Sequence, residues 1–219
     1  MKLLLTSGGI TNKSIEKALF DLVGKKPEDT SAVFVLTASN MEKGDKTWLI
    51  DDLVYLKKQN FKSIDITDIP AVQENIWKPK FEEADIIFFE GGNEYYLMEW
   101  IDKSGLKSVM PEFLKNKVYV GVSAGSIVAG KNLDVKIMQT AYGEDFDKNQ
   151  NMACMGLVNF NFFPHLNSYY FKKVREDLMK ELAKEIQEKV YVLDDNSALK
   201  VVDGKVEVIS EGKWFLINA

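Results

Sequence analysis

Val118-Tyr119-Val120-Gly121-Val122-Ser123-Ala124-Gly125 joins an apolar run to a Gly-x-Ser-x-Gly pentapeptide. The apolar run predicts a buried strand, and the small residues 126–129 that follow predict a helix. A strand, this pentapeptide and a helix in that order are typical of a nucleophile elbow. Its tight turn holds the serine hydroxyl clear of the sheet, where backbone N–H groups at the helix start can stabilise an oxyanion. The stretch therefore predicts an α/β fold with Ser123 as a candidate nucleophile.

The same alternation of apolar runs and helical patterns extends over the first 130 residues. Strands are predicted at 2–5, 32–36, 63–66, 86–89 and 118–120, and helices at 12–23, 45–59, 94–101 and 109–114. Continuous apolar strands separated by helices predict a mainly parallel, doubly wound sheet that is covered on both faces.

The pattern changes after about residue 131. Residues 132–142 predict a strand or hairpin, 143–152 a polar loop, and 170–186 a long amphipathic helix. Four short strands follow at 191–193, 199–202, 206–209 and 214–217, with a hairpin turn at Asp203-Gly204. Because no linker or repeat divides the chain, we expect one α/β domain over 1–219 with a small C-terminal antiparallel β element.

Composition limits the classes of function. The net charge of −5 and the absence of a basic stripe argue against a nucleic-acid partner. No apolar run approaches the roughly 18–20 residues that span a bilayer, and the N-terminal apolar run stops at Thr6, which favours a first strand over a signal peptide. Cys154 is the only cysteine, so no internal disulfide forms, which fits a reducing cytoplasm. We therefore expect a cytoplasmic protein with no membrane partner.

Metal chemistry has little support in the sequence. With Cys154 and His165 as the only cysteine and histidine, the usual zinc ligand set is absent. No EF-hand or P-loop pattern appears, although an oxygen-ligand Mg²⁺ or Ca²⁺ site stays open. We expect neither a metal nor a cofactor.

Ser123 needs a base, because a serine hydroxyl is a poor nucleophile until its proton is removed. The only histidine, His165, follows the apolar Phe162-Phe163 and Pro164, in what reads as a loop leaving the sheet. A carboxylate should orient its imidazole. The candidates are Asp134, Glu144, Asp145 and Asp147 before the histidine, and Asp194 and Asp195 after it. The last two follow the strand at 191–193, and sites on parallel sheets gather at the carboxyl ends of strands, which favours them.

Glu90-Gly91-Gly92-Asn93 forms a second constellation at the carboxyl end of a predicted strand. Paired glycines let backbone approach a ligand and leave N–H groups free. The N–H of Gly91 or Gly92 could form an oxyanion hole with that of Ala124. Ser7-Gly8-Gly9 is a similar turn after the first strand and lacks a dinucleotide-binding pattern.

A set of four motifs, in order, resembles peptidase family S51, the serine peptidases that include α-aspartyl dipeptidase (dipeptidase E) and cyanophycinase. The motifs are Gly91-Gly92-Asn93, Gly121 to Gly125, Phe163-Pro164-His165 and Asp195-Asn196-Ser197-Ala198-Leu199. The resemblance implies a flavodoxin-like fold related to class I glutamine amidotransferases. It implies Ser123 as nucleophile, His165 as base and Asp195 as acid, at a position where the family usually has glutamate. Asp134 is the nearest match to a further acid assigned in dipeptidase E.

These residues lead to three hypotheses. The first is a serine peptidase for short peptides, and the resemblance implies dipeptides with an N-terminal Asp. The second is an α/β-hydrolase esterase, although 54 residues follow His165, whereas that fold places its histidine late in the chain. The third is a non-catalytic binding protein on the same fold. Whether the chain is a monomer or a homodimer stays open.

Overall fold

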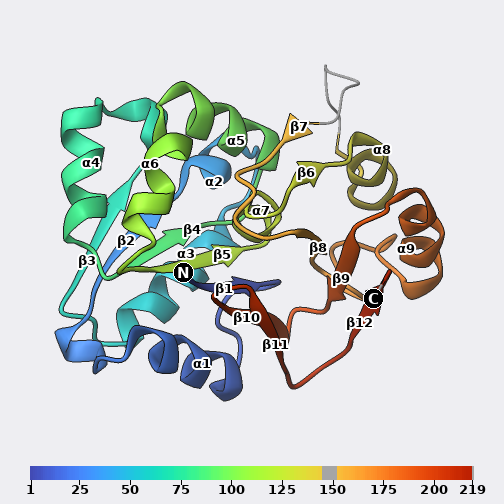
Figure 1. The fold of residues 1–219 in the computed structure, drawn as a ribbon, viewed down its shortest axis with the longest axis horizontal. Helices are drawn as coiled ribbons and strands as arrows, with labels where there is room; N and C mark the ends of the chain where they lie inside the picture. The colour runs from blue at the N-terminus through green and yellow to red at the C-terminus, as the bar shows by residue number, and fades with distance from the viewer. Residues whose placement is uncertain (145–151, 219) are drawn as a thin grey trace.

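A seven-stranded sheet forms the centre of the computed structural model, which describes residues 1–144 and 152–218 (Figure 1). The strand order is β11-β10-β1-β5-β4-β2-β3. The strands are β1 (Lys2–Thr6), β2 (Ser31–Val35), β3 (Ser63–Thr67), β4 (Ile86–Phe89), β5 (Val118–Val122), β10 (Ser197–Val202) and β11 (Lys205–Ser210). The first five in sequence pair in parallel, whereas β10 and β11 run antiparallel to their neighbours.

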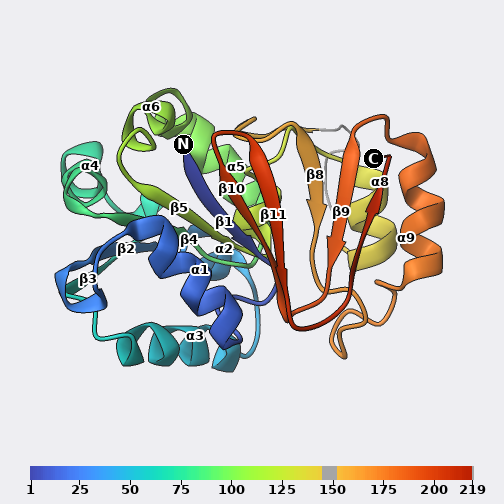
Figure 2. The same ribbon diagram turned by 60° about the horizontal axis from the view of Figure 1, so that its bottom comes forward.

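Helices cover both faces of this sheet, with α1 and α3 on one side and α4, α5 and α6 on the other (Figure 2). The helices around it are α1 (Lys13–Val23), α2 (Thr37–Met41), α3 (Thr47–Lys58), α4 (Glu74–Glu83), α5 (Glu94–Lys103), α6 (Leu106–Phe113) and α7 (Ala124–Ile127). Alternate residues of β1 point into two different hydrophobic clusters. Leu3 and Leu5 belong to the cluster that includes α4, α5 and α6, and Leu4 belongs to the cluster that includes α1 and α3. The prediction of a doubly wound, mainly parallel α/β fold is confirmed.

The predicted C-terminal strands all form, but they are shared between two sheets. β10 and β11 extend the central sheet through a hairpin whose turn residues Asp203 and Gly204 both have positive φ, as a type I′ turn requires. β9 (Lys189–Leu193) and β12 (Trp214–Ile217) join β8 (Phe160–Phe163) in a three-stranded sheet of order β12-β9-β8. Here β8 and β9 are parallel, and β9 and β12 antiparallel.

Two predictions for the region after residue 131 are wrong. Only β6 (Asn132–Leu133) of the predicted strand at 132–142 is extended, and it pairs with β7 (Met152–Ala153). The chain then turns helical through α8 (Val135–Ile137) and a π-helical segment, Met138–Tyr142. The predicted helix at 170–186 is much shorter, with α9 at Glu176–Leu182 and a 3-10 turn at Ala183–Glu185.

The predicted polar loop at 143–152 lies largely outside the described residues. Two helices, α2 and α4, were not predicted, and further 3-10 turns occur at Pro27–Asp29 and Ile69–Ala71. Among the helices of the described residues, none combines the length and apolarity that a membrane crossing requires.

Candidate active site

The nucleophile elbow forms where β5 ends and α7 begins, at the carboxyl edge of the central sheet. Ser123 has φ 47° and ψ −108°, a backbone conformation that is strained for any residue other than glycine. The turn is held because the Ser123 N–H donates to the Thr6 carbonyl, while the N–H groups of Ser126 and Ile127 donate to the Ser123 carbonyl. The predicted turn is therefore present in detail.

The two glycines of the pentapeptide are required by close backbone contacts. A Cβ on Gly121 would lie 2.6 Å from the Ser126 nitrogen, and one on Gly125 would lie 2.0 Å from the Phe89 carbonyl oxygen. Both distances are far below van der Waals contact, so α7 can approach β4 and β5 this closely only with glycine at these positions. This close approach places Ser123 beside the end of β4.

Ser123, His165 and Asp195 form a continuous chain of hydrogen bonds. Ser123 Oγ lies 2.8 Å from His165 Nε2, and His165 Nδ1 lies 2.6 Å from Asp195 Oδ1. These contacts join the end of β5, the loop after β8 and the turn between β9 and β10. The arrangement is that of a nucleophile, a base and an orienting carboxylate.

Asp195 is held by several further hydrogen bonds. Ser7 Oγ donates to Asp195 Oδ1 at 2.9 Å and accepts the His165 backbone N–H at 2.7 Å. Thr11 Oγ1 donates to the Asp195 carbonyl oxygen at 2.7 Å. Burial alone would raise the pKa of the Asp195 carboxyl, but hydrogen bonds from His165, Ser7 and Ser168 hold it below its usual range. Asp195 is therefore ionised at neutral pH, as is needed to stabilise an imidazolium.

The imidazole of His165 is fixed by stacking as well as by hydrogen bonds. The ring of Phe171 lies parallel to it, with centroids 4.4 Å apart and 12° between the planes. The guanidinium of Arg175 donates to the backbone carbonyls of Phe171, Val174 and Ser168. Arg175 therefore closes the loop that carries Phe171, and this loop takes the place of the first part of the predicted helix.

The Gly91-Gly92 turn lies directly beside the nucleophile. A Cβ on Gly91 would be 3.3 Å from Ser123 Cβ. The Gly91 N–H donates to Glu90 Oε1 at 2.9 Å, so it is already engaged. Within the described residues, the N–H groups of Gly92 and Ala124 donate to no acceptor. Of the three predicted oxyanion donors, these two are the ones left free.

The other predicted carboxylates lie elsewhere. Asp134 caps α8 by accepting the Ile137 N–H, and Asp194 accepts the backbone N–H groups of Asn196 and Lys213. Burial and nearby Glu42 raise the pKa of Glu144 to about 7, and within the described residues His165 pairs with Asp195 and not with Glu144. Asp145 and Asp147 lie outside the described residues. The structure thus brings Asp195, and not Asp134, to the imidazole.

Sequence reasoning missed the supporting residues Ser7, Phe171 and Glu90. Ser7 and Glu90 carried a signal, since each lies in a glycine-containing turn after a predicted strand, at the carboxyl edge where the site was expected, but neither was given a role. Phe171 stood within a segment that was predicted to be helical. In residues 1–144 and 152–218, no group of three or more His, Cys, Asp or Glu side chains is arranged to hold a metal ion.

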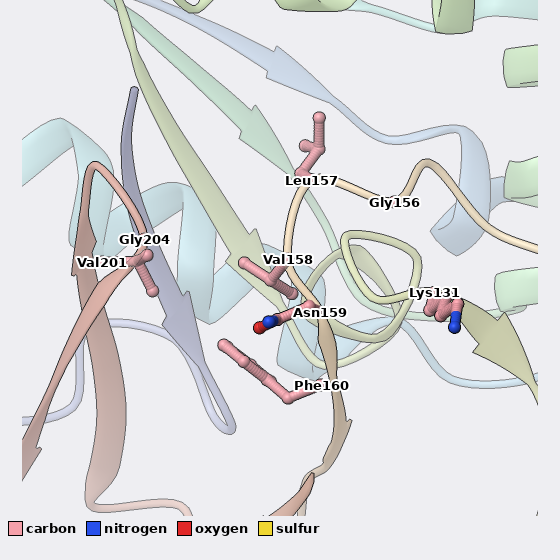
Figure 3. Close-up of a pocket in the computed structure, with 8 residues that line it drawn as sticks. All are labelled: Lys131, Gly156, Leu157, Val158, Asn159, Phe160, Val201 and Gly204. Atoms are coloured by element: carbon pink, nitrogen blue, oxygen red, sulfur yellow. The ribbon is translucent and has the colours of Figure 1, made fainter. Parts of the chain in front are cut away.

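A cavity of about 500 Å³ is lined by none of the three triad residues. Figure 3 shows the residues that border it. It is bordered by the β10–β11 turn and by residues 156–160. The turn between β10 and β11 follows Val202, which pairs with Lys2 at the start of β1. Ser7 and Ser123, by contrast, directly follow the carboxyl ends of β1 and β5. The cavity is therefore at the opposite edge of the central sheet from Ser123.

Known proteins that are similar to this chain include several peptidases. A family model described as peptidase family S51 matches residues 3–209. An uncharacterised peptidase of Listeria innocua is 21% identical over 200 residues, covering 82% of this chain and 95% of that protein. A peptidase E of Streptomyces coelicolor is 27% identical over 128 residues, covering 56% of this chain and 51% of that protein.

A crystal structure from Listeria monocytogenes has a TM-score of 0.77 at 21% identity, covering 96% of this chain and 98% of that chain. The crystal structure of a peptidase from an acI-B1 actinobacterium has a TM-score of 0.64 at 19% identity, covering 100% of this chain and 94% of that chain. These two likenesses concern the fold. Because the family model spans nearly all of the sequence, the chain belongs to peptidase family S51.

Proposed function

We propose that the protein is a serine peptidase that hydrolyses short peptides through Ser123, His165 and Asp195. The observation that carries the proposal is the hydrogen-bonded chain from Ser123 Oγ through the imidazole to Asp195 Oδ1. Membership of family S51 supports peptidase activity. A non-catalytic role would leave the strained backbone of Ser123 without a purpose.

In this mechanism Ser123 Oγ attacks the scissile carbonyl carbon while its proton moves to His165 Nε2. The carbonyl oxygen becomes an oxyanion that accepts from the N–H groups of Gly92 and Ala124. The C–N bond then breaks, and His165 gives its proton to the leaving amine. Water hydrolyses the acyl-enzyme with His165 again as base, and Asp195 stabilises the imidazolium in both halves of the reaction.

The substrate's first residue is the open part of the proposal. The resemblance to α-aspartyl dipeptidase favours dipeptides with an N-terminal Asp. An acidic side chain would need a cationic partner, and the only arginine, Arg175, already donates to three backbone carbonyls. A lysine would therefore have to supply the charge.

A panel of dipeptides X-Leu, with X as Asp, Asn, Lys or Leu, tests the proposal. We expect hydrolysis of at least one member by the wild type and its loss in Ser123→Ala. Full activity in Ser123→Ala would reject the proposal. Faster cleavage of p-nitrophenyl acyl esters than of every peptide in the panel would favour an esterase instead.

A further inference from the structure

The turn that carries the oxyanion donor is fixed at both of its peptide groups. On one side, Glu90 Oε1 accepts the Gly91 N–H at 2.9 Å. On the other, Ser39 Oγ donates to the Gly91 carbonyl oxygen at 2.8 Å. Both side chains are buried, with Glu90 1% and Ser39 0% exposed. Neither hydrogen bond is part of β4 or α5. The position of both hydrogen bonds at the catalytic turn therefore suggests a role in holding that turn.

The bond from Ser39 sets the direction of the next N–H. In a trans peptide the carbonyl and the following N–H point in opposite directions. Since the Gly91 carbonyl points to Ser39 on α2, the Gly92 N–H points away from α2. The turn also packs closely against α2, because a Cβ on Gly92 would lie only 2.4 Å from the Ala38 carbonyl oxygen.

We propose that Glu90 and Ser39 are positioning residues that hold the Gly91-Gly92 turn so that the Gly92 N–H, and not the Gly91 N–H, faces the oxyanion formed at Ser123. Glu90 keeps the Gly91 N–H occupied, and Ser39 prevents rotation of the Gly91-Gly92 peptide. This inference rests on the proposed function and goes beyond it, because it assigns roles to two residues that do not touch the substrate.

The protonation of Glu90 suits this role. Burial, and then the charge of nearby Asp52 on α3, raise the pKa of Glu90 well above its usual range. A neutral carboxyl still accepts the Gly91 N–H and places no full negative charge beside the developing oxyanion. Gln at this position has the same shape and the same acceptor, so Glu90→Gln should preserve the turn, whereas Glu90→Leu removes the acceptor.

The test is the second-order rate constant with which a fluorophosphonate probe labels Ser123, because the phosphonyl oxygen uses the same N–H donors. We expect Ser39→Ala and Glu90→Leu to label at least about 10-fold more slowly than the wild type, as for a misplaced oxyanion donor. Glu90→Gln should label within about threefold of the wild type. With a dipeptide substrate, the loss should appear in kcat with KM little changed.

Thr37→Val is the matched control. Thr37 is on the same helix as Ser39, is equally buried, and its hydroxyl donates to Asp68 instead of the glycine turn. Wild-type labelling rates in Ser39→Ala and Glu90→Leu would overturn the proposal, as would equal slowing in Thr37→Val or in Glu90→Gln. If Glu90→Leu does not fold, the labelling rate of Ser39→Ala alone tests the proposal. A wild type that fails to label would instead reject the serine peptidase proposal itself.

Discussion

Asp195 reaches His165 although its side chain is one methylene shorter than the glutamate implied by the family resemblance. The turn after β1 lies directly against it, since a Cβ on Gly8 would be 2.9 Å from Asp195 Cβ. Ser7, in the same turn, donates to the carboxylate. Gly8 therefore leaves no room for a side chain of its own beside Asp195, and we expect a longer acid at position 195 to fit less well against this turn.

Replacing Asp195 tests this directly. Asp195→Asn should lower kcat by roughly 10²- to 10⁴-fold, because an amide no longer stabilises the imidazolium or fixes its tautomer. Asp195→Glu should also be less active than the wild type, because its extra methylene crowds Gly8. Steady-state hydrolysis of the best dipeptide measures both. Wild-type activity in Asp195→Asn would remove Asp195 from the triad.

Ser7 provides a milder test at the same site. Ser7→Ala removes the donor to Asp195 Oδ1 and the acceptor for the His165 backbone N–H. Loss of one such hydrogen bond is worth about 1–3 kcal/mol, so we expect kcat to fall roughly 5- to 100-fold with the fold retained. Ser14→Ala, on the exposed end of α1, is the control, and equal losses in the two variants would contradict a role for Ser7.

At the scale of residues, the sequence predicts the catalytic candidates Ser123 and His165 better than the residues that hold them in place. A lone histidine and a Gly-x-Ser-x-Gly pentapeptide leave few choices for Ser123 and His165. Phe171 and Arg175 were not predicted as supports, because their roles depend on a loop that folds over the imidazole through contacts of Arg175 with three carbonyls. Such contacts have no periodic signature in the sequence.

At the scale of elements, the elbow depends on the close packing of α7 on β4 and β5. Gly125→Ala would place a Cβ 2.0 Å from the Phe89 carbonyl, a backbone atom that cannot rotate away. We expect the free energy of unfolding to fall by at least about 3 kcal/mol. Chemical denaturation measures this loss.

Gly24→Ala is the matched control for the elbow glycine. Gly24 ends α1 with φ 71° and has no atom within 4 Å of an added Cβ. Its replacement should cost only about 1 kcal/mol, because just the backbone strain of a left-handed residue applies. A Gly125→Ala variant no less stable than Gly24→Ala would contradict the packing of α7 described here.

Most elements of the first 130 residues could be predicted, because the strands other than β3 are largely apolar and the longer helices α1 and α5 have an amphipathic face, whereas α2 and α4 were not predicted. The later ones could not. Residues 170–175 have a helical pattern but form the loop over His165, and residues 135–142, half of which are β-branched or aromatic, turn helical. In both places tertiary contacts outweigh local propensity, as with the hydrogen bond from Tyr142 Oη to the Pro164 carbonyl.

At the scale of the whole molecule, the sequence predicts a parallel sheet but not the order of its strands. The observed order puts β1 between β5 and β10, and this brings Ser7, Ser123 and Asp195 to one edge. That order depends on which hydrophobic faces pair, and several orders would bury the same residues. The sharing of the C-terminal strands between two sheets could not be predicted for the same reason.

The partly buried acid Asp52 makes the stability of the fold depend on pH. Burial raises the pKa of Asp52 from its ordinary 3.8 to about 6. Because the folded-state pKa is the higher one, its stabilising effect is complete below about pH 4 and is lost as the pH rises through about 6. Asp52→Asn should therefore become more stable relative to the wild type between pH 4 and pH 7, by up to about 3 kcal/mol.

Denaturant titrations at both pH values measure this difference. Asp51→Asn, at the exposed neighbouring position on α3, is the control and should leave the pH dependence nearly unchanged. A stability difference between Asp52→Asn and the wild type that is the same at pH 4 and pH 7 would show that Asp52 does not titrate in this range.

The central claim is that Ser123 is a nucleophile activated by His165. Its most direct test is the mapping of a fluorophosphonate adduct by mass spectrometry on the intact protein and its peptides. We predict one phosphonyl group per chain on Ser123, none in Ser123→Ala, and much slower labelling in His165→Ala. An unlabelled wild type, or an adduct on a residue other than Ser123, would contradict the account.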